Sequence, residues 1–395
     1  MGFAYETGET LLRRFDALER RREYSRLEVI SRRLERLTLT ASGFFRGAPS
    51  LFFDLLRTHP SAKELLGKDR RWIVGDVHME NIGVIAIGRG KLVWDFNDLD
   101  EACVQSPLLD VVRGAASAAV AAVDLGYGTS AAIRAAEAFI VAYLRPLAET
   151  EPRVVTDLVA RAEARTVIDM LDERCPEKKG RRRFVTGKRY LALTRAERTV
   201  VEDLFERYAK DNPLDVPKTL RLQDAAFRVQ GTGSLGVSRF IMLVSVGKKG
   251  ERLLVEAKEM RKSAVERGGM VKTRAPRVGE AGRVHDAMHS LLAAPQEGVR
   301  AIKGTDRRSY LVRKHAPGED KLVITALRDQ DELVALARTI GFRLSRAHVR
   351  AANLPAPAFD PSLALSVAFD LALAMVRAHL ALAVRASVKS GTVKA

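Results

Sequence analysis

The sequence predicts an α+β protein with a mainly helical large lobe and a small lobe built on an antiparallel sheet. Aromatic residues make up only 6% of the chain, and Ala, Leu and Val supply most of its apolar content, which favours helices over extensive sheet. Helical periodicity runs through residues 8–39, 329–352 and 361–388. From about residue 219, by contrast, apolar and polar residues alternate in short segments bounded by glycine turns, as is typical of antiparallel strands.

Length and changes of pattern predict how the chain is divided. Its 395 residues, 47% of them hydrophobic, can bury a sizeable core, and this length favours two or three domains or two lobes of one fold. Four segments follow from the pattern: N-terminal helices at 1–70, a further part of the helical lobe at 71–218, the small lobe at 219–325 and C-terminal helices that complete the large lobe at 326–395.

Three features indicate a cytoplasmic protein without a membrane span. Cys103 and Cys175 lie far apart in sequence, so neither a disulfide framework nor a zinc site is expected. The N-terminal segment lacks the apolar core of a secretory signal. The longest apolar stretch, 363–376, contains Asp370 and is followed by Arg377. We expect a buried helix there, too short and too charged to cross a bilayer.

The net charge of +17 has two explanations. One is an anionic partner, such as a nucleotide, a phosphorylated substrate, nucleic acid or a membrane surface. The other is an arginine-rich surface without a dedicated partner. The densest basic run, 178–183, is followed closely by Lys188 and Arg189 and lacks interleaved aromatic residues. We expect a solvated loop there rather than a site that reads bases, and nucleic acid is the less favoured partner.

The candidate catalytic residues follow a short predicted strand at 71–74. Asp76 and Asn81 have the Asp-x-x-x-x-Asn spacing of a kinase catalytic loop, and Asp95 ends an apolar strand 19 residues after Asp76. A phosphoryl-transfer site needs one acid to orient the attacking hydroxyl, and an amide and a second acid to hold Mg²⁺. We therefore predict that Asp76 is catalytic and that Asn81 and Asp95 bind the metal, with Asp98 as a second acidic ligand.

Other polar residues near this loop have structural alternatives. His78 is either a turn residue satisfied by the backbone, as a lone histidine usually is, or a member of the catalytic site. The similar Gly-Asp-x-His-x-x-Asn loop of small-molecule kinases implies the latter, with a positional role rather than that of a general base. Asp98, Asp100 and Glu101 either bind a second metal or cap the helix that follows. Arg46 stands in an apolar setting, where it is either paired structurally, which we favour, or directed at an anion.

The small lobe carries the candidate nucleotide-binding residues. A G-x-G-x-x-G turn at 231–236 lies between two predicted strands rather than at a helix start, so it does not fit a dinucleotide-binding fold. Absent side chains there let backbone N–H groups approach phosphates. Lys258 lies on a later strand and Glu280 on the next helix, as in the lysine–glutamate pair of kinases. The predicted nucleotide-binding residues are Gly231, Gly233, Ser234, Gly236, Lys258 and Glu280.

Taken together, these segments resemble one known family over most of the chain. The chain is similar to the bacterial domain of unknown function 2252 family in SGFFRGAPSLFFDLL at 42–56, GDVHMENIG at 75–83, VWDFNDLDEA at 93–102, GTGSLGVSRF at 231–240 and the region 313–352. The catalytic loop also resembles that of aminoglycoside and choline kinases, which implies ATP, Mg²⁺ and a hydroxyl acceptor. In kinase-like folds an acid near the position of Asp110, otherwise a helix cap, braces this loop.

The order of the parts implies a circularly permuted, protein-kinase-like fold. In ordinary kinases the glycine-rich turn, the lysine and the glutamate precede the catalytic loop, whereas here they follow it. The predicted helix at 336–350 looks like the one that normally runs into the catalytic loop, yet it lies near the end of the chain. Permutation is tolerable because lobes assemble by packing rather than by chain order. Phe-Asn-Asp rather than Phe-Gly follows Asp95, so no mobile activation loop is expected.

The sequence therefore predicts an ATP- and Mg²⁺-dependent phosphotransferase that acts on a hydroxyl of a small molecule. In this hypothesis Asp76 orients or deprotonates the acceptor, and Lys258, fixed by Glu280, binds the nucleotide phosphates. Two alternatives stay open. One is a nucleotide-binding pseudokinase or nucleotidyl transferase of the same fold, and the other is a basic nucleic-acid-binding protein without catalysis.

Overall fold

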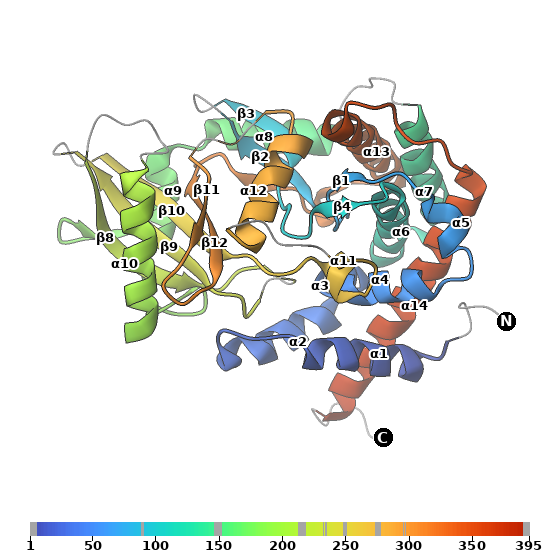
Figure 1. Cartoon of the computed structure of the whole chain (residues 1–395), viewed down its shortest axis with the longest axis horizontal. Helices are drawn as coiled ribbons and strands as arrows, with labels where there is room; N and C mark the ends of the chain where they lie inside the picture. Colours follow the sequence, from blue (N-terminus) through green and yellow to red (C-terminus); the bar gives the residue numbers. More distant parts are fainter. Residues whose placement is uncertain are drawn as a thin grey trace.

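The structure is a computed structural model that describes residues 6–87, 91–145, 152–211, 219–231, 233, 235–247, 251–272, 278–294, 296 and 298–389. It is a mixed α+β protein with 53% helix, 18% strand and antiparallel sheets, which confirms the predicted class at that level. In Figure 1 a large sheet occupies one end of the molecule and long helices occupy the other.

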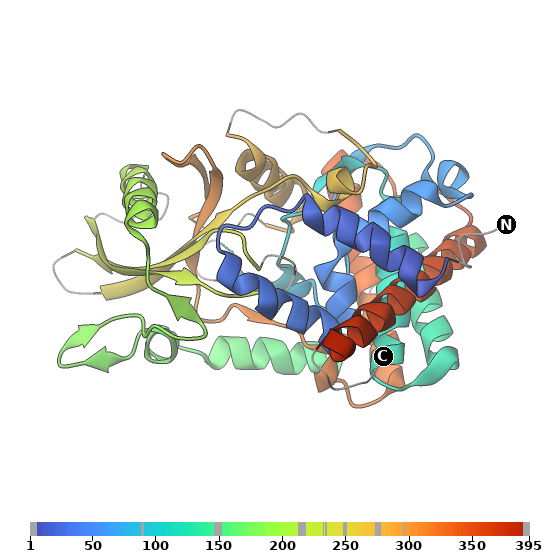
Figure 2. The same ribbon diagram turned by 90° about the horizontal axis from the view of Figure 1, so that it is seen from below.

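The N-terminal segment is a series of short helices. They are α1 (Gly8–Arg20), η2 (Leu27–Val29), α2 (Ile30–Leu39), α3 (Ala41–Gly47), α4 (Pro49–Thr58) and α5 (Ala62–Leu66). Thr7 caps α1 by accepting the backbone N–H of Thr10, and the apolar face of α1 buries Leu11 and Phe15. Figure 2 shows α1 beside the C-terminal helix α14 (Pro361–Lys389), so both ends of the described chain meet on the large lobe.

Two small antiparallel sheets frame the candidate catalytic loop. The strand β1 (Arg71–Ile73) pairs with β4 (Cys103–Gln105), and β2 (Ile82–Ala86) pairs with β3 (Leu92–Phe96). On its other edge β2 pairs with β13 (Asp320–Lys321). The segment 74–81 therefore joins one sheet to the other, and residues 97–102 return from the second sheet to the first. This arrangement brings the two segments side by side.

Long helices form the core of the large lobe: α6 (Leu108–Asp124), α7 (Gly128–Leu144), α13 (Gln330–Ala352) and α14. Small residues let α7 approach both α6 and α13. A side-chain carbon added at Gly114 would lie 2.1 Å from Cζ of Phe139, and one at Gly341 would lie 2.2 Å from the carbonyl oxygen of the same Phe139. Because the contact at Gly341 requires backbone movement and that at Gly114 requires displacement of the packed Phe139 ring, glycine on α6 and α13 fixes the spacing of the three helices.

Along the chain, the helices α6 and α7 are followed, before β8, by α8 (Arg153–Ala164), α9 (Val167–Arg174), β5 (Glu177–Lys178), β6 (Arg181–Arg182), β7 (Tyr190–Leu191) and α10 (Arg195–Lys210). The basic run at 178–183 is therefore part of a short hairpin rather than the solvated loop we expected. The residues of this hairpin are mostly exposed, as expected for a solvated segment. Within it, Arg182 forms an ion pair with Asp172 at 2.6 Å. Local ion pairing accounts for part of its charge.

The small lobe is an antiparallel sheet in the order β11-β12-β10-β9-β8-β7. Its strands and helices are β8 (Leu220–Arg228), β9 (Arg239–Val246), β10 (Glu251–Glu259), α11 (Ala264–Arg267), α12 (Glu280–Leu291), β11 (Arg300–Lys303) and β12 (Ser309–His315), with η4 (Ile324–Ala326) after β13. Alternate residues of β9 bury opposite faces: Phe240 and Met242 pack toward α10, whereas Ile241 and Leu243 pack toward α9. Both faces of the sheet are therefore covered.

The C-terminal helix α14 is longer than the apolar stretch in the sequence suggests. Within the described residues, Pro361–Val388 is long and apolar enough to cross a membrane by length and composition alone, and half of its most apolar window is buried in the protein. Core helices of soluble proteins have the same properties, so this single helix is weak evidence for a span. Our length argument against a span is wrong, and the cytoplasmic location stays a prediction.

Candidate functional site

The candidate catalytic loop, residues 74–81, is held from behind by Asp110 on α6. The fully buried Asp110 carboxylate accepts the backbone N–H of Val74 at 2.6 Å and that of Gly75 at 2.9 Å. It also lies 3.1 Å from Nε2 of His348 on α13. Asp110 therefore braces the loop, as the resemblance implies, rather than capping its own helix.

Gly75 lets this loop pass directly against the acidic segment, residues 98–101, that follows β3. Its φ is +78°, and a side-chain carbon there would lie 2.0 Å from the carbonyl oxygen of Glu101. Only glycine fits such a close approach with a left-handed backbone. Asp76, the next residue, is thereby held beside the acidic segment.

Asp76 faces a cavity and is paired with a buried arginine. Its Oδ1 accepts from Nε of Arg113 at 2.8 Å, and the Arg113 guanidinium lies over the rings of Phe45 and Phe52 at 4.3 and 4.8 Å. Burial outweighs the opposing effect of Arg113 and raises the pKa of Asp76 to about 6. A carboxylate with this pKa is ionised at neutral pH and basic enough to accept a proton.

His78 has the positional role predicted for it. Its Nδ1 accepts the backbone N–H of Glu80 at 3.1 Å. Burial and the nearby charge of Arg46 hold the pKa of His78 well below its usual range, so the ring is neutral. Arg46 itself forms an ion pair with Glu80, which confirms the structural pairing that we favoured, although Arg46 also lines the cavity.

Asn81 offers an unused amide oxygen. Its Nδ2 donates to the carbonyl oxygens of Asp76 at 2.8 Å and Asp98 at 3.0 Å. Within the described part of the chain, its buried Oδ1 has no hydrogen-bond partner. An unpaired buried amide oxygen costs free energy unless something binds it, and oxygen is the ligand that hard cations prefer.

Asp95 does not lie where the sequence led us to expect. It is 2% exposed, and its two carboxylate oxygens accept the backbone N–H groups of Phe96 and Ala293, each at 2.9 Å. Asp95 is also absent from the lining of the cavity. This contradicts its predicted place as the main metal ligand at this cavity, because the carboxylate lies outside the lining and is bonded to the backbone instead.

Asp98 and Asp100 are the acids that contact Lys258 of the small lobe. Asp100 forms an ion pair with Nζ of Lys258, and Oδ1 of Asp98 lies 3.4 Å from the same Nζ. Nζ of Lys321 on β13 lies 3.7 Å from Oδ2 of Asp98. Burial opposes ionisation of Asp98, yet the two lysines hold its pKa far below the usual range. Burial and the charge of Asp98 raise the pKa of Asp100 to about 6.

The predicted ion pair between Lys258 and Glu280 is not formed. Oε2 of Glu280, the first residue of α12, accepts from Nε of Arg283 at 2.6 Å. The α12 residues that line a small cavity together with Lys258 are Val284 and Met288. Positions 280, 284 and 288 share one face of the helix, but each is about 6 Å further along its axis. Glu280 therefore lies about one turn away from the level of the lysine.

The glycine turn, residues 231–236, joins β8 to β9 as predicted. Gly231 and Gly236 have φ values of +84° and +88°, and a side-chain carbon on Gly236 would lie 2.3 Å from the ring of Tyr24. Gly231 and Gly233 line the cavity. Ser234, also predicted to bind nucleotide, lies outside the described residues. Glycine is thus required both by backbone conformation and by the close approach of the N-terminal segment.

This contact with the N-terminal segment was missed by sequence reasoning. Arg36 donates to the carbonyl oxygen of Gly231 and Arg22 to that of Gly233. In the sequence, residues 8–39 read only as amphipathic helices, and no motif marks the two arginines. A contact across about 200 residues of chain leaves no local signal, so only the fold reveals it.

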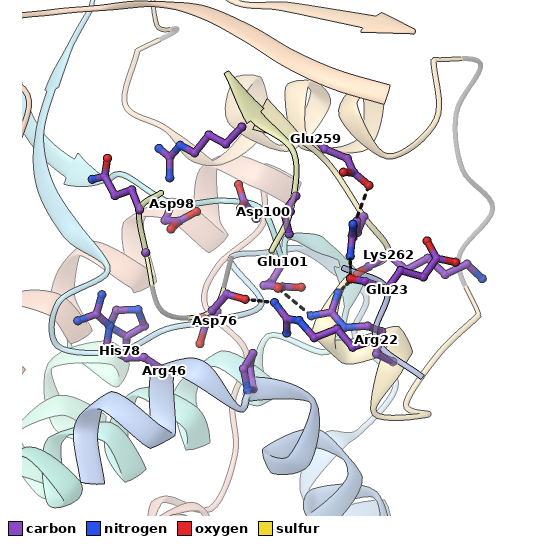
Figure 3. Close-up of a pocket in the computed structure, with 18 of the residues that line it drawn as sticks. Arg22, Glu23, Arg46, Asp76, His78, Asp98, Asp100, Glu101, Glu259 and Lys262 are labelled. Atoms are coloured by element: carbon purple, nitrogen blue, oxygen red, sulfur yellow. Dashed lines mark hydrogen bonds and ion pairs between the residues drawn. The ribbon is translucent and has the colours of Figure 1, made fainter. Parts of the chain in front are cut away.

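A cavity of about 390 Å³ lies among the candidate catalytic loop, the acidic segment, the glycine turn and the N-terminal helices (Figure 3). Its volume falls within the range of small-molecule sites. The predicted residues that line it are Asp76, His78, Asp98, Gly231 and Gly233. Lys258 lies next to it through its contacts with Asp98 and Asp100. Asp100, which the sequence offered only as a possible ligand of a second metal, also lines it, and the sequence did not single out Lys321.

The oxygen donors at this cavity fit Mg²⁺. No three His, Cys, Asp or Glu side chains among the described residues form a ready metal cluster. Mg²⁺ does not need one, because it is usually bound by one or two carboxylates, water and substrate phosphates. Asp98 and Asp100 line the cavity and form such an incomplete oxygen set. Asn81 does not line the cavity, but its Nδ2 is bonded to the backbone of Asp98 and its Oδ1 has no partner within the described residues.

Comparison with known proteins identifies a family that covers most of the chain. A family model described as an uncharacterized protein conserved in bacteria (DUF2252) matches residues 27–388. No curated protein and no solved structure matches the chain.

Proposed function

This chain belongs to the DUF2252 family of uncharacterised bacterial proteins, and we propose that it is an ATP- and Mg²⁺-dependent phosphotransferase acting on a hydroxyl of a small molecule. The proposal depends mainly on one observation: Lys258 contacts Asp98 and Asp100, and these two acids line the same cavity as Asp76. Lys258 and Asp98 are 160 residues apart in sequence, yet their side chains lie 3.4 Å apart. Phosphoryl transfer needs such a lysine for the phosphates next to acids for the metal.

The order of the elements supports a circularly permuted, kinase-like fold. The glycine turn joins β8 to β9, Lys258 lies on β10, and α12 precedes β11 and β12. Protein kinases use the same succession of glycine-rich loop, lysine strand and helix. At the other end of the chain, α13 packs against β1, which leads into the candidate catalytic loop. A break between α13 and that loop accounts for the order observed.

In the proposed reaction Asp76 acts on the acceptor. Its carboxylate accepts the hydroxyl proton as the acceptor oxygen forms a bond to the γ-phosphorus of ATP. The bond from that phosphorus to the β,γ-bridging oxygen breaks, and ADP leaves with the bonding electrons. Arg113 holds Asp76 in place, and Asp110 fixes the backbone just before it. His78 is neutral and only shapes the turn.

The phosphates and metal are assigned to the other side of the cavity. Asp98, Asp100 and Oδ1 of Asn81 would hold Mg²⁺, which offsets phosphate charge when bound. Burial alone would lower the pKa of Lys258, but Asp100 and Asp98 raise it, so the lysine is charged. Lys258 is thereby suited to bind phosphate oxygens, together with the backbone N–H groups of the glycine turn.

Loss of Lys258 tests the proposal. We expect Mg-ATP to raise the Tm of the wild type and to leave that of Lys258→Met unchanged, because ligand binding to the folded state stabilises it by about 2.7 kcal/mol at 100 times Kd. The matched control is Lys303→Met, an exposed lysine on β11 of the same sheet, which should respond like the wild type. An unresponsive wild type, or equal responses in Lys258→Met and wild type, contradicts the proposal.

The missing Lys258–Glu280 pair favours one second candidate, a nucleotide-binding protein of this fold that transfers AMP or transfers nothing. Product mass separates the three cases. Phosphoryl transfer yields ADP and an acceptor heavier by one phosphate, nucleotidyl transfer yields pyrophosphate and an AMP adduct, and a pseudokinase leaves ATP intact. We expect ADP and the phosphorylated acceptor.

The pKa of Asp76 predicts a pH dependence. The carboxyl must be ionised to accept a proton, and its pKa is raised to about 6. Activity is therefore expected to be full above about pH 7 and to fall about tenfold per pH unit below about pH 6. The measurement is kcat/KM for ATP turnover across this range. Mg²⁺ is kept saturating, so that protonation of Asp100, a proposed metal ligand with a similar pKa, does not limit metal binding. A flat profile from about pH 5 to pH 7 would contradict the role of Asp76.

A further inference from the structure

The cavity wall on the side of the N-terminal helices and of residues 259–267 is strongly cationic. Among the described residues the cations of this wall are Arg21, Arg22, Arg46, Arg261, Lys262 and Arg267, and the whole lining of the cavity has eight Arg and Lys residues against six Asp and Glu residues. Figure 3 shows Arg22 and Lys262 on one side of Asp76 and Arg46 on the other. An acceptor whose hydroxyl reaches Asp76 would therefore have cations on both flanks.

The same wall is unsuited to a cationic acceptor. No aromatic residue is found among the described residues that line the cavity, and Pro49 and Val237 are its apolar side chains. Sites for quaternary ammonium groups use aromatic cages, and sites for polyamines need an excess of carboxylates. The resemblance of the catalytic loop to aminoglycoside and choline kinases therefore does not extend to the acceptor wall.

Arg22 carries positive charge that its surroundings do not balance. Glu19, 3.9 Å from Arg22, pairs more closely with the buried Arg33 at 2.9 Å, while Arg267 is paired with Glu101 at 3.0 Å. Burial and the charges of Arg33 and Arg267 lower the pKa of Arg22 to about 9. The three guanidinium groups of Arg22, Arg33 and Arg267 are thus paired with only two carboxylates. An anionic ligand bound beside Arg22 would neutralise the remaining positive charge.

Unused hydrogen-bond donors lie at the same place. Nε of Arg22 and Nε of Arg46 are both buried, and neither has a hydrogen-bond partner in the described part of the chain. Buried guanidinium donors without partners are costly, and planar oxyanions such as carboxylate and phosphate are the groups that pair best with them. The excess charge therefore points to an anionic ligand.

We propose that the acceptor is a small hydroxyl compound bearing a carboxylate or phosphate group, held by Arg22, Arg46 and Lys262 with its hydroxyl at Asp76. This inference rests on the proposed phosphotransferase function and specifies its substrate class. Arg46 and Arg22 flank the site from α3 and from the end of α1, and Lys262 follows β10. The two lobes therefore both contribute to it.

Matched probes test the charge of the acceptor. Isothermal titration calorimetry without nucleotide compares glycerol 3-phosphate and glycerate with neutral glycerol and cationic choline. We expect saturable binding of one or both anionic probes and none of glycerol or choline. The better anionic probe shows whether phosphate or carboxylate is recognised. Absence of binding by both anionic probes, or equal binding of glycerol or choline, overturns the proposal.

Variants locate the binding. Lys262→Gln and Arg46→Gln are each expected to weaken the anionic probe about tenfold, as loss of one charge-assisted contact does. Lys262 is 66% exposed, so its replacement does not threaten folding even where loss of the Arg46–Glu80 pair does. The control is Arg13→Gln, which removes a 69% exposed arginine on α1 and should bind like the wild type. Unchanged affinity in both Lys262→Gln and Arg46→Gln overturns the proposal.

Lys258→Met separates this inference from the proposed function. It removes the lysine assigned to nucleotide phosphates and should retain the anionic probe, which then does not occupy the phosphate site. Loss of probe binding in Lys258→Met overturns the acceptor site. Probe binding by a wild type that fails to respond to Mg-ATP supports the anion site and refutes the phosphotransferase. A wild type that responds to Mg-ATP but binds neither anionic probe refutes the anion site and leaves the phosphotransferase proposal standing.

Discussion

Replacing Asp76 with asparagine is expected to lower kcat for Mg-ATP turnover by about 10²–10⁴-fold, the usual contribution of a positioned general base. Asparagine keeps an oxygen that can accept from Arg113 at the position now 2.8 Å from its Nε, but it cannot take up the acceptor proton. Because Lys258, Asp98 and the glycine turn are unchanged, Kd for Mg-ATP should stay within about threefold of wild type. The measurements are initial rates of ADP release and calorimetric titration with a non-hydrolysable ATP analogue.

The control for Asp76→Asn is Asp54→Asn. Asp54 is 17% exposed against 16% for Asp76, and it also pairs with an arginine, Arg14 at 2.7 Å, but it lies on α4 and does not line the cavity. Similar burial and pairing make the general cost of neutralising a carboxylate comparable. Wild-type kcat in Asp76→Asn, or an equal loss in Asp54→Asn, would show that Asp76 has no special role.

The sequence predicts the elements well where a local pattern determines them. The apolar run 240–244 in β9 follows from burial of both sheet faces, and the sharp turn at Gly75 follows from a backbone that only glycine adopts. Helical periodicity over 361–388 likewise predicted α14, which spans Pro361–Lys389. The hairpin of β5 and β6 was missed because its residues are charged and exposed, so no apolar pattern marks it.

The site was predictable only in part, because several of its contacts depend on how distant segments meet. The brace by Asp110 was anticipated only from the resemblance to kinase-like folds, because its position in the sequence suggests a helix cap. The capture of Asp95 by the backbone of Ala293 joins residues 198 apart, and no local pattern records it. The pairing of Lys258 depends on the axial position of α12, which sequence spacing does not fix. The composition shows that the chain has an excess of positive charge, but it does not predict that several of these cations lie beside Asp76.

Replacing Asp110 with alanine is expected to destabilise the fold by about 3–5 kcal/mol, the cost of breaking a buried charged network by removing one partner. The fully buried carboxylate binds two backbone N–H groups, of Val74 and Gly75, and the buried His348, which in turn contacts Tyr143 at 2.9 Å. Alanine leaves these groups without a partner and without access to water. The free energy of unfolding from urea titration measures the effect.

Asp124→Ala shows whether burial, rather than the number of bonds, determines this cost. Asp124 also accepts two backbone N–H groups, of Ala41 at 2.9 Å and Ser42 at 2.6 Å, at the start of α3. It is only half-buried, so water can replace its carboxylate, and we expect a loss of about 1 kcal/mol, as for a helix cap. Equal losses in the two variants would mean that Asp110 acts as an ordinary cap. A much larger loss in Asp110→Ala means that the candidate catalytic loop keeps its shape because its backbone is bonded to a charge that water cannot replace.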